Sequence, residues 1–144
     1  MMTTPYHLEI EDLHKFFVDW FCATLPQTKE AFHRFSGVMA AEMHMTTPDG
    51  QKLSNEQLIK DLWQAYGHRH MQRDYFRIWI ENIQIQSESS TDATVSYEEW
   101  QQIDDKGTQT RRQSSVLFRR RKDTPNGLEW VKVHETWLKD LPKK

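Results

Sequence analysis

The second half of the chain is a succession of long strands separated by turn signals, and this feature limits the possible folds most. Residues 74–86 read D-Y-F-R-I-W-I-E-N-I-Q-I-Q, in which apolar residues alternate up to Ile80 and resume one step out of phase at Ile83. Successive side chains of a strand point to opposite faces, so this slip of phase predicts a β-bulge near Glu81 and Asn82. A bulge there bends the sheet.

Three further strands follow, and turn residues lie between them. The alternating runs predict strands over about 93–104, 108–121 and 130–138, joined by the turn sequences D-D-K-G and T-P-N-G. Strands joined by short turns of this composition are antiparallel neighbours. We therefore expect an antiparallel sheet at the C-terminal end.

The first half is mainly helical. Apolar residues recur at spacings of three and four across residues 7–24, which predicts a long amphipathic helix with a strongly aromatic face. Pro26 is expected in the first turn of a short second helix that ends near Phe35. Residues 37–47 predict a strand.

A third helix follows the first predicted strand after a tight turn. The sequence P-D-G at 48–50 is typical of a turn, and Ser54 with Gln57 forms a capping box that begins a helix. Gly67 ends the apolar pattern of that helix. The expected order is thus helix, helix, strand, helix and four strands.

Composition fits one globular domain. The chain has 144 residues, of which 37% are hydrophobic and 12% aromatic, so we expect one domain over 1–144 with a core of about 7–138. The net charge of −2 favours no polyanionic partner, and the basic run at 119–122 is typical of a solvated strand end. We expect no nucleic-acid partner.

The single cysteine and the N-terminal sequence indicate the compartment. Cys22 cannot close an intramolecular disulfide, and its apolar neighbours are typical of a buried thiol in a reducing compartment. The N-terminus has no basic region followed by an apolar run, and no apolar run approaches the length that spans a bilayer. We expect a cytoplasmic protein without membrane contact.

This order of elements, the P-D-G-x-x-L-S step at 48–54 and the closing W-V-K-V-H-E-T-W resemble the nuclear transport factor 2-like superfamily, specifically its small SnoaL-like, DUF-type members. The resemblance covers about residues 7–138. It implies an α+β fold in which a strongly bent, mixed and largely antiparallel sheet wraps around the long N-terminal helix. The resulting cone encloses an interior pocket, and the resemblance also implies a homodimer through the sheet.

The resemblance also sets an expectation about catalysis. Isomerase and cyclase enzymes of the superfamily resemble one another in carrying an acidic side chain just before a proline at the end of the first strand, where this chain has Thr47. The isomerases carry a tyrosine on the first helix, which here reads F-F-V-D-W-F. Threonine cannot act as a carboxylate base at neutral pH. Both departures count against an isomerase or cyclase mechanism.

His134 is the strongest single candidate for catalysis. Histidine is the side chain whose ordinary pKa permits proton transfer near neutrality. Glu98 on a neighbouring strand is the expected partner that would orient it, whereas Asp49 fits a turn former. The alternative for His134 is a pocket-wall or core histidine with a satisfied hydrogen bond.

Other residues are candidates for contact with a ligand. Arg112 and Ser114 share a strand face and would offer a charge and a hydroxyl to an anionic or carbonyl-bearing molecule, unless that face is solvated. Large side chains could line a pocket, although such residues more often form the core. The candidate ligand-binding residues are Trp20, Met43, Trp63, Tyr66, Trp79, Trp100, Arg112, Ser114 and His134.

We expect neither a metal nor a cofactor. His44, His68 and His70 have no third ligand at regular spacing. The favoured function is therefore binding of a small, partly apolar or partly anionic molecule in an aromatic-lined pocket. The alternatives are an isomerase-, cyclase-, dehydratase- or hydrolase-like enzyme that uses His134, and an association domain whose pocket is incidental.

Overall fold

The computed structural model describes residues 3–138. Its elements, in chain order, are α1 (Pro5–Phe21), α2 (Lys29–Ser36), β1 (Met39–Thr46), β2 (Lys52–Ser54), α3 (Asn55–Gln64), the 3₁₀ helix η1 (His70–Gln72), β3 (Arg77–Glu88), β4 (Asp92–Gln102), β5 (Gln109–Arg120) and β6 (Leu128–Trp137).

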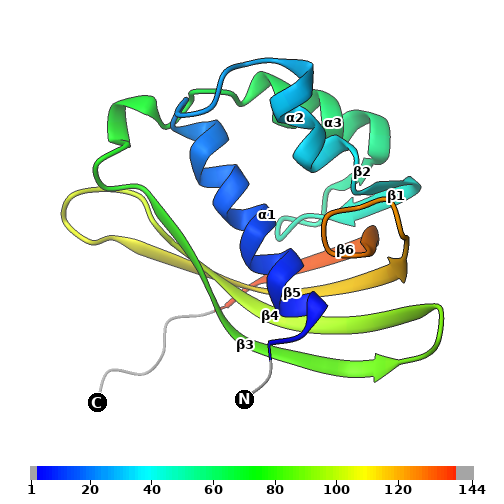
Figure 1. Cartoon of the computed structure of the whole chain (residues 1–144). Coiled ribbons are helices and arrows are strands. Elements are labelled where there is room, and N and C mark those ends of the chain that lie inside the picture. The colour runs from blue at the N-terminus through cyan, green and yellow to red at the C-terminus, as the bar shows by residue number, and fades with distance from the viewer. Residues whose placement is uncertain (1–2, 139–144) are drawn as a thin grey trace, which may run out of the picture.

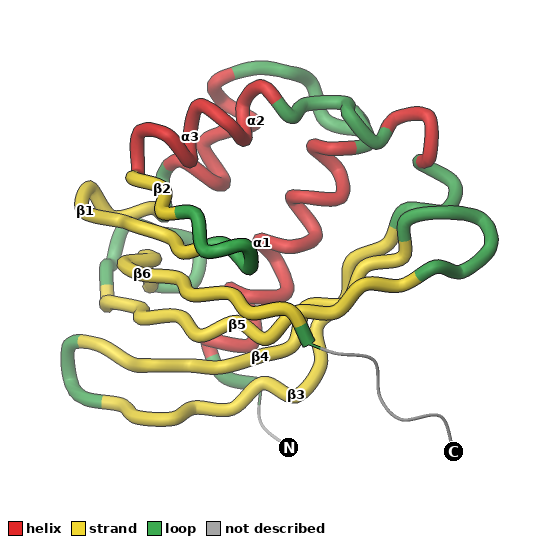
Figure 2. Tube along the Cα trace, turned by 180° about the vertical axis from the view of Figure 1, so that it is seen from behind, coloured by secondary structure: helices red, strands yellow, loops and turns green. Residues whose placement is uncertain are grey.

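The strands form one six-stranded sheet of order β2-β1-β6-β5-β4-β3. All neighbours pair antiparallel except β1 and β6, which are parallel. Figure 1 shows α1 crossing the concave side of the sheet, with α2 and α3 at one end of it. The view from behind shows the strands curving around the helices (Figure 2). The predicted fold class, an α+β cone with a mixed, largely antiparallel sheet, is confirmed.

Side-chain caps set where the helices begin. Thr4 accepts a hydrogen bond from the backbone N–H of His7, and α1 begins with Pro5, two residues before the predicted start. Thr28 caps α2 in the same way. Pro26 therefore lies before α2, whereas the sequence pattern predicted it in the first turn of that helix. Ser54 accepts from the Gln57 N–H at the start of α3, which confirms the predicted cap.

The strand pairing shifts register at four places, and two of these irregularities decide which way side chains point. Asn82 has a φ of 57°, and the pairing of β3 with β4 shifts between Glu81 and Gln84, so the predicted bulge is confirmed. The second irregularity lies in β6, where Lys132 pairs with Leu117 but Trp130 pairs with Phe118. Val131 is therefore an extra residue in this strand.

The bulge at Val131 decides which side chains of β6 face the interior. Trp130, Val133 and Glu135 all line the cavity inside the cone. A regular strand would place Trp130 on the opposite face from Val133, because side chains alternate. The bulge therefore brings Trp130 and Val133 to the same, inner face, although alternation along the sequence assigns them to opposite faces.

A buried carboxylate joins the first helix to three other parts of the fold. The Glu9 side chain is fully buried, and Arg34 of α2 donates to it with two N–H groups at 2.8 and 3.3 Å. Trp130 Nε1 donates at 2.8 Å, and Asn126 of the turn before β6 donates at 3.0 Å. Every oxygen of this carboxylate therefore has a donor, as burial requires.

Candidate functional site

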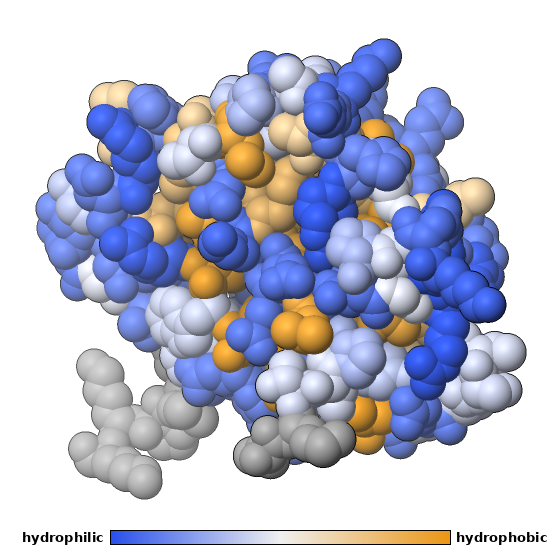
Figure 3. Space-filling view, viewed as in Figure 1, coloured by the Kyte–Doolittle hydropathy of each residue, from blue (hydrophilic) through white to orange (hydrophobic). Residues whose placement is uncertain are grey.

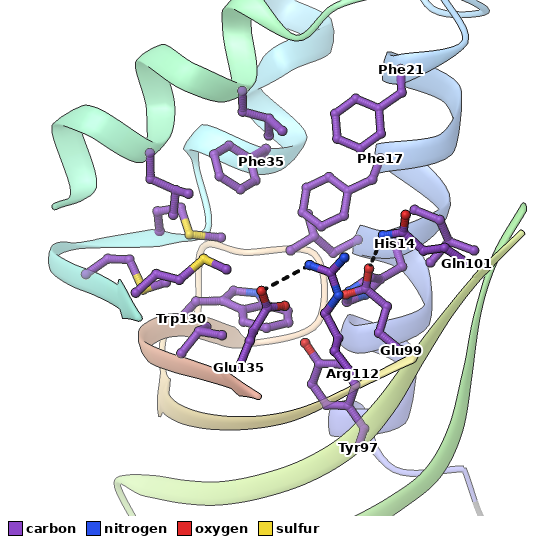
Figure 4. Close-up of a pocket in the computed structure, with 18 residues that line it drawn as sticks. His14, Phe17, Phe21, Phe35, Tyr97, Glu99, Gln101, Arg112, Trp130 and Glu135 are labelled. Carbon is purple, nitrogen blue, oxygen red and sulfur yellow. Dashed lines mark hydrogen bonds and ion pairs between the residues drawn. The ribbon is translucent and has the colours of Figure 1, made fainter. Parts of the chain in front are cut away.

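A cavity of about 200 Å³ lies between α1, α3 and the concave face of the sheet. Figure 4 shows Phe17, Phe21 and Phe35 at one end and the charged residues, with Tyr97 and Trp130 beside them, at the other. The lining residues are Leu13, His14, Phe17, Phe21, Phe35, Met39, Met43, Met45, Leu58, Leu62, Ile78, Tyr97, Glu99, Gln101, Arg112, Trp130, Val133 and Glu135.

A second hollow of about 400 Å³ lies on the other side of α1, against β3. His14 and Ile78 line both spaces. Charged side chains such as Lys15 and Arg77 border the second hollow, and both are exposed. We take the smaller, mainly apolar cavity as the candidate site, because such a lining suits a small ligand.

The polar end of the cavity is built from inward-facing positions of three adjacent strands and one helix. Tyr97 and Glu99 lie on β4, Arg112 on β5 and Glu135 on β6, while His14 lies one helical turn after Ile10 on the apolar face of α1. The register pairs Tyr97 with Ser114 and Ser114 with Glu135, which brings the three strands' inward side chains together.

His14 and Glu99 form a buried ion pair. His14 Nδ1 lies 2.7 Å from the Ile10 carbonyl oxygen, which only accepts, so Nδ1 donates. Nε2 lies 3.0 Å from a Glu99 carboxylate oxygen, and Gln101 donates to the other oxygen at 2.7 Å. Burial alone would lower the pKa of His14, but the Glu99 charge and these hydrogen bonds raise it overall. Burial would likewise raise the pKa of Glu99, but the His14 charge holds it below its usual range.

Glu135 is the one carboxyl of the cavity with a pKa shifted upward. Burial is the largest cause, and the neighbouring Glu99 charge adds to it, while Arg112 and His14 oppose it. The pKa of Glu135 rises to about 7. Its carboxylate accepts from Arg112 Nη1 at 3.3 Å and from Ser114 Oγ at 3.5 Å. The pKa values of the two carboxyls on this wall therefore shift in opposite directions, because Glu99 has His14 at 3.0 Å whereas Glu135 is mainly affected by burial.

Arg112 offers unused hydrogen-bonding capacity at the cavity. Its Nε is buried and has no acceptor among residues 3–138. The guanidinium carbon lies 4.7 Å from the centre of the Trp137 ring, and Trp137 Nε1 donates to Asp49 at 3.2 Å. The P-D-G turn and the end of β6 therefore fix the position of Arg112.

The neutral hydroxyl of Tyr97 also borders the cavity. Burial, with the Glu99 and Glu135 charges, raises the pKa of this phenol well above its usual value. Tyr97 therefore keeps its proton near neutral pH and can donate a hydrogen bond. A ligand oxygen at this end meets donors from Arg112 and Tyr97, and also from Glu135 when that carboxyl is protonated.

The opposing shifts in this cluster predict a stability maximum at mildly acid pH. The contribution of Glu99 to the stability of the fold is lost as pH falls below 4.5, the ordinary pKa of a glutamate, because the pKa of Glu99 is lower in the folded protein. The contribution of Glu135 to stability is lost as pH rises from 4.5 to about 7, because its pKa is higher in the folded protein. The contribution of His14 is lost above pH 6.5 for the same reason. The melting temperature should peak near about pH 5 and fall toward about pH 8.

A substitution of Glu135 tests whether this residue causes the predicted pH dependence of stability. Glu135→Gln should remove most of the fall on the alkaline side, which corresponds to about 3 kcal/mol at most. Melting curves of both proteins between about pH 4 and 9 measure this. A wild-type melting temperature that stays level or rises from about pH 5 to 8 would contradict the assignment.

Only two of the ligand-binding residues predicted from the sequence line this cavity, Met43 and Arg112. Trp20 is fully buried in the core and donates to the Leu62 carbonyl at 2.8 Å, and its ring contacts those of Trp63 and Tyr66. Trp20, Trp63 and Tyr66 therefore lie in the aromatic core between the helices and do not line this cavity, although they had been predicted as ligand-binding residues.

The remaining predicted residues lie behind or outside the wall. Ser114 is fully buried and contacts the site through Glu135. Trp79 and Trp100 are stacked on each other at 5.8 Å, and Arg111, next to the inward-facing Arg112, lies over the Trp100 ring. Trp79 also borders the second hollow beside α1, whereas Trp100 lines neither space.

The structure does not bring His134 and Glu98 into the cavity. His134 is exposed and pairs with Thr46 and Ser115, between the inward-facing Val133 and Glu135. Glu98 accepts from Trp100 Nε1 and Asn82 Nδ2 on the outer face. His134 and Glu98 therefore do not face this cavity, because the bulge at Val131 turns Glu135 inward and His134 outward.

Other sequence features have structural partners. Arg119 pairs with Glu42 and Glu129, Arg120 with Glu88 and Arg121 with Asp123. Burial raises the pKa of the free Cys22 thiol.

Within residues 3–138 no cluster of three or more potential metal ligands occurs, and no helix is long and apolar enough to cross a membrane. Figure 3 shows a mainly hydrophilic surface with apolar residues in patches.

A cone of six strands around a long helix, with a pocket between them, defines a protein of the nuclear transport factor 2-like superfamily. The chain belongs to the family described as Sucrose-6-phosphate phosphohydrolase C-terminal, which it matches over residues 8–139. It is 22% identical to Sucrose-phosphatase 2 of Nicotiana tabacum over 130 aligned residues. This alignment covers 90% of this chain and 30% of the tobacco protein. The chain thus spans less than a third of that relative.

Solved structures share the fold. An NTF-2 like protein of unknown function from Pseudomonas aeruginosa superposes with a TM-score of 0.80 at 25% identity, covering 94% of this chain and 99% of that one. A domain of unknown function with a cystatin-like fold from Nostoc punctiforme has a TM-score of 0.63 at 13% identity, covering 97% and 82%. The second likeness concerns the fold alone.

Proposed function

We propose that the chain is a binding domain for a small, mainly apolar molecule that carries one polar group. The observation that carries this proposal is the cavity of about 200 Å³, which is lined mainly by aromatic, methionine and leucine side chains and also by a charged cluster. Pockets that bind small molecules have this composition, because apolar contacts supply affinity and a few polar groups fix orientation. The volume suits a ligand on the order of ten non-hydrogen atoms.

The family relationship bears on which ligand to expect. The tobacco relative is a sucrose-phosphatase, and this chain matches only 30% of its length. A sugar phosphate carries many hydroxyls, each of which loses free energy when buried without a partner. The apolar lining residues, which include Phe17, Met43 and Leu58, offer none. We therefore infer a less polar ligand for this cavity.

A thermal-shift screen tests the binding proposal. Small aromatic acids, amides, phenols and cyclic ketones should include compounds that raise the melting temperature, since a ligand at a hundred times its dissociation constant adds about 2.7 kcal/mol of stability. Leu58→Phe, which adds volume to the cavity wall, should abolish these shifts. Leu8→Phe is the matched control, because Leu8 is 45% exposed and does not line the cavity. A hit that Leu58→Phe leaves unchanged would contradict binding in the cavity.

A second candidate function is acid–base catalysis, favoured by Glu135, whose pKa of about 7 suits proton transfer near neutral pH. Proton exchange at the carbon next to the carbonyl of a cyclic ketone, followed by NMR in D₂O, tests it. Glu135→Gln should abolish enzyme-dependent exchange, whereas His134→Ala should leave it unchanged. Exchange that survives Glu135→Gln would exclude this role.

Two expectations from the sequence stay predictions: the homodimer through the sheet and the cytoplasmic location. The stacked Trp79 and Trp100 and the neighbouring Arg111 provide large side chains for such a contact. Sedimentation at micromolar concentration distinguishes a dimer from a monomer.

A further inference from the structure

The charged wall of the cavity is balanced only when Glu135 is ionised. Its four charged groups are His14, Glu99, Arg112 and Glu135. His14 and Glu99 neutralise each other at 3.0 Å, which leaves Arg112 with Glu135 at 3.3 Å as the second pair. When Glu135 takes up a proton, Arg112 becomes a partly buried cation that has lost its ion-pair partner. An apolar cavity then favours the entry of one anion.

The hydrogen-bonding groups of the wall suit a carboxylate as that anion. Arg112 has a buried Nε–H without an acceptor in the described residues, although Glu135 already accepts from Nη1. A planar carboxylate accepts two parallel N–H groups from one guanidinium. Trp137 holds the guanidinium plane in place, and protonated Glu135 would add an O–H donor beside it.

The weak contacts of Glu135 permit this exchange of partners. Its hydrogen bonds from Arg112 and Ser114 measure 3.3 and 3.5 Å, both longer than the 3.0 Å pair of Glu99 with His14. Charge-assisted hydrogen bonds of normal strength are about 2.7–2.9 Å long. The groups that face Glu135 are Glu99 and Tyr97 from β4, Arg112 from β5 and His14 from α1. Of the two carboxyls, Glu135 is the one that can accept a proton near neutral pH.

We propose that the cavity takes a small carboxylic acid as its anion, held by Arg112, and that binding adds one proton to Glu135. This inference rests on the proposed binding function and names its ligand class. The ligand carboxylate replaces the Glu135 carboxylate as the counter-ion of Arg112, and the proton comes from solvent. The apolar body of the acid lies toward Phe17, Phe35 and Met43.

Proton uptake gives the binding a characteristic pH dependence. Below a pH of about 7, Glu135 already carries its proton in the free protein, so affinity does not change while the ligand stays ionised. Above that pH, affinity falls tenfold per unit, because each binding event must take up one proton. An amide of the same shape has no charge and should show no such slope.

The experiment uses benzoate, phenylacetate and hexanoate, each paired with its amide, in calorimetric titrations of the full chain between about pH 6 and 8.5. At least one acid should bind more than tenfold tighter than its amide at about pH 6 and lose affinity tenfold per unit above about pH 7. Titrations at about pH 8 in two buffers of different ionisation enthalpy should report uptake of close to one proton.

Variants separate the roles of the two residues. Glu135→Gln mimics the protonated side chain, so the acid should bind equally well at about pH 6 and 8. Arg112→Met with Glu135→Gln removes both charges together and should bind the amide but not the acid. Arg111→Met and Glu98→Gln, on the outer face, are the matched controls and should keep the wild-type slope.

The possible results separate this inference from the binding proposal. An acid that binds no better than its amide, or a pH slope that persists in Glu135→Gln, overturns the carboxylate and the proton uptake while binding in the cavity stands. Failure of every acid and every amide to bind contradicts the proposed binding function itself.

Discussion

Glu9→Ala is expected to destabilise the protein by about 3–5 kcal/mol, which is the usual loss when one partner of a buried charged network is removed. The carboxylate is fully buried, and its loss leaves Arg34, Asn126 and the Trp130 indole N–H without their acceptor. Because these donors come from α2, the turn before β6 and β6 itself, the substitution loosens three junctions at once.

The measurement is chemical and thermal unfolding of Glu9→Ala beside Glu11→Ala. Glu11 lies on the exposed side of the same helix, so its substitution should change stability by less than about 0.5 kcal/mol. A fall in melting temperature on the order of 10 °C is expected for Glu9→Ala. Equal stabilities of the two variants would contradict the role assigned to the buried network.

His14→Leu is expected to cost a similar amount, about 3–5 kcal/mol near neutral pH, because it leaves Glu99 as a buried charge without its cation. Glu99 would then retain only Gln101 as a close hydrogen-bond donor among the described residues. The pKa of Glu99 should rise, so the destabilisation of the variant relative to the wild-type protein should be smaller at about pH 5 than at about pH 7. That response differs from the loss caused by an ordinary cavity, which does not depend on pH.

A double-mutant cycle completes this test. The double variant His14→Leu with Glu99→Met replaces the pair by apolar groups and should be more stable than His14→Leu alone, since apolar replacements of buried ion pairs are often neutral. His134→Leu, on the exposed outer face, controls for the loss of an imidazole. Additive effects of the two single substitutions would exclude an energetic coupling between His14 and Glu99.

Local signals in the sequence were sufficient for most of the fold. The cap at Ser54 and the slip of phase between Ile80 and Ile83 are written in neighbouring residues, so the third helix and the first bulge could be predicted. The bulge at Val131 could not, because alternation there gives two apolar faces and pairing with Phe118 decides between them. That single extra residue determined which face of the last strand lines the cavity.

The charged wall was missed for a related reason. His14 and Glu99 are 85 positions apart, and a single sequence holds no signal that joins them. One signal for His14 was available, because it follows Ile10 by four residues on the apolar face of the helix, where a histidine needs a partner. Arg112 and Met43 lie in predicted strands and were named as candidates, but alternation along the strands left open which face is inward, and the structure places both residues in the cavity lining.

The central claim is that the cavity binds a small molecule, and methionine methyl NMR tests it most directly. The chain has six methionines, and Met39, Met43 and Met45 line the cavity whereas Met71 is 80% exposed on the surface. Titration with the best probe from the acid and amide pairs should shift the methyl signals of Met39, Met43 and Met45 and leave that of Met71 unchanged. Shifts confined to Met71, or spread equally over all four, would contradict binding inside the cone.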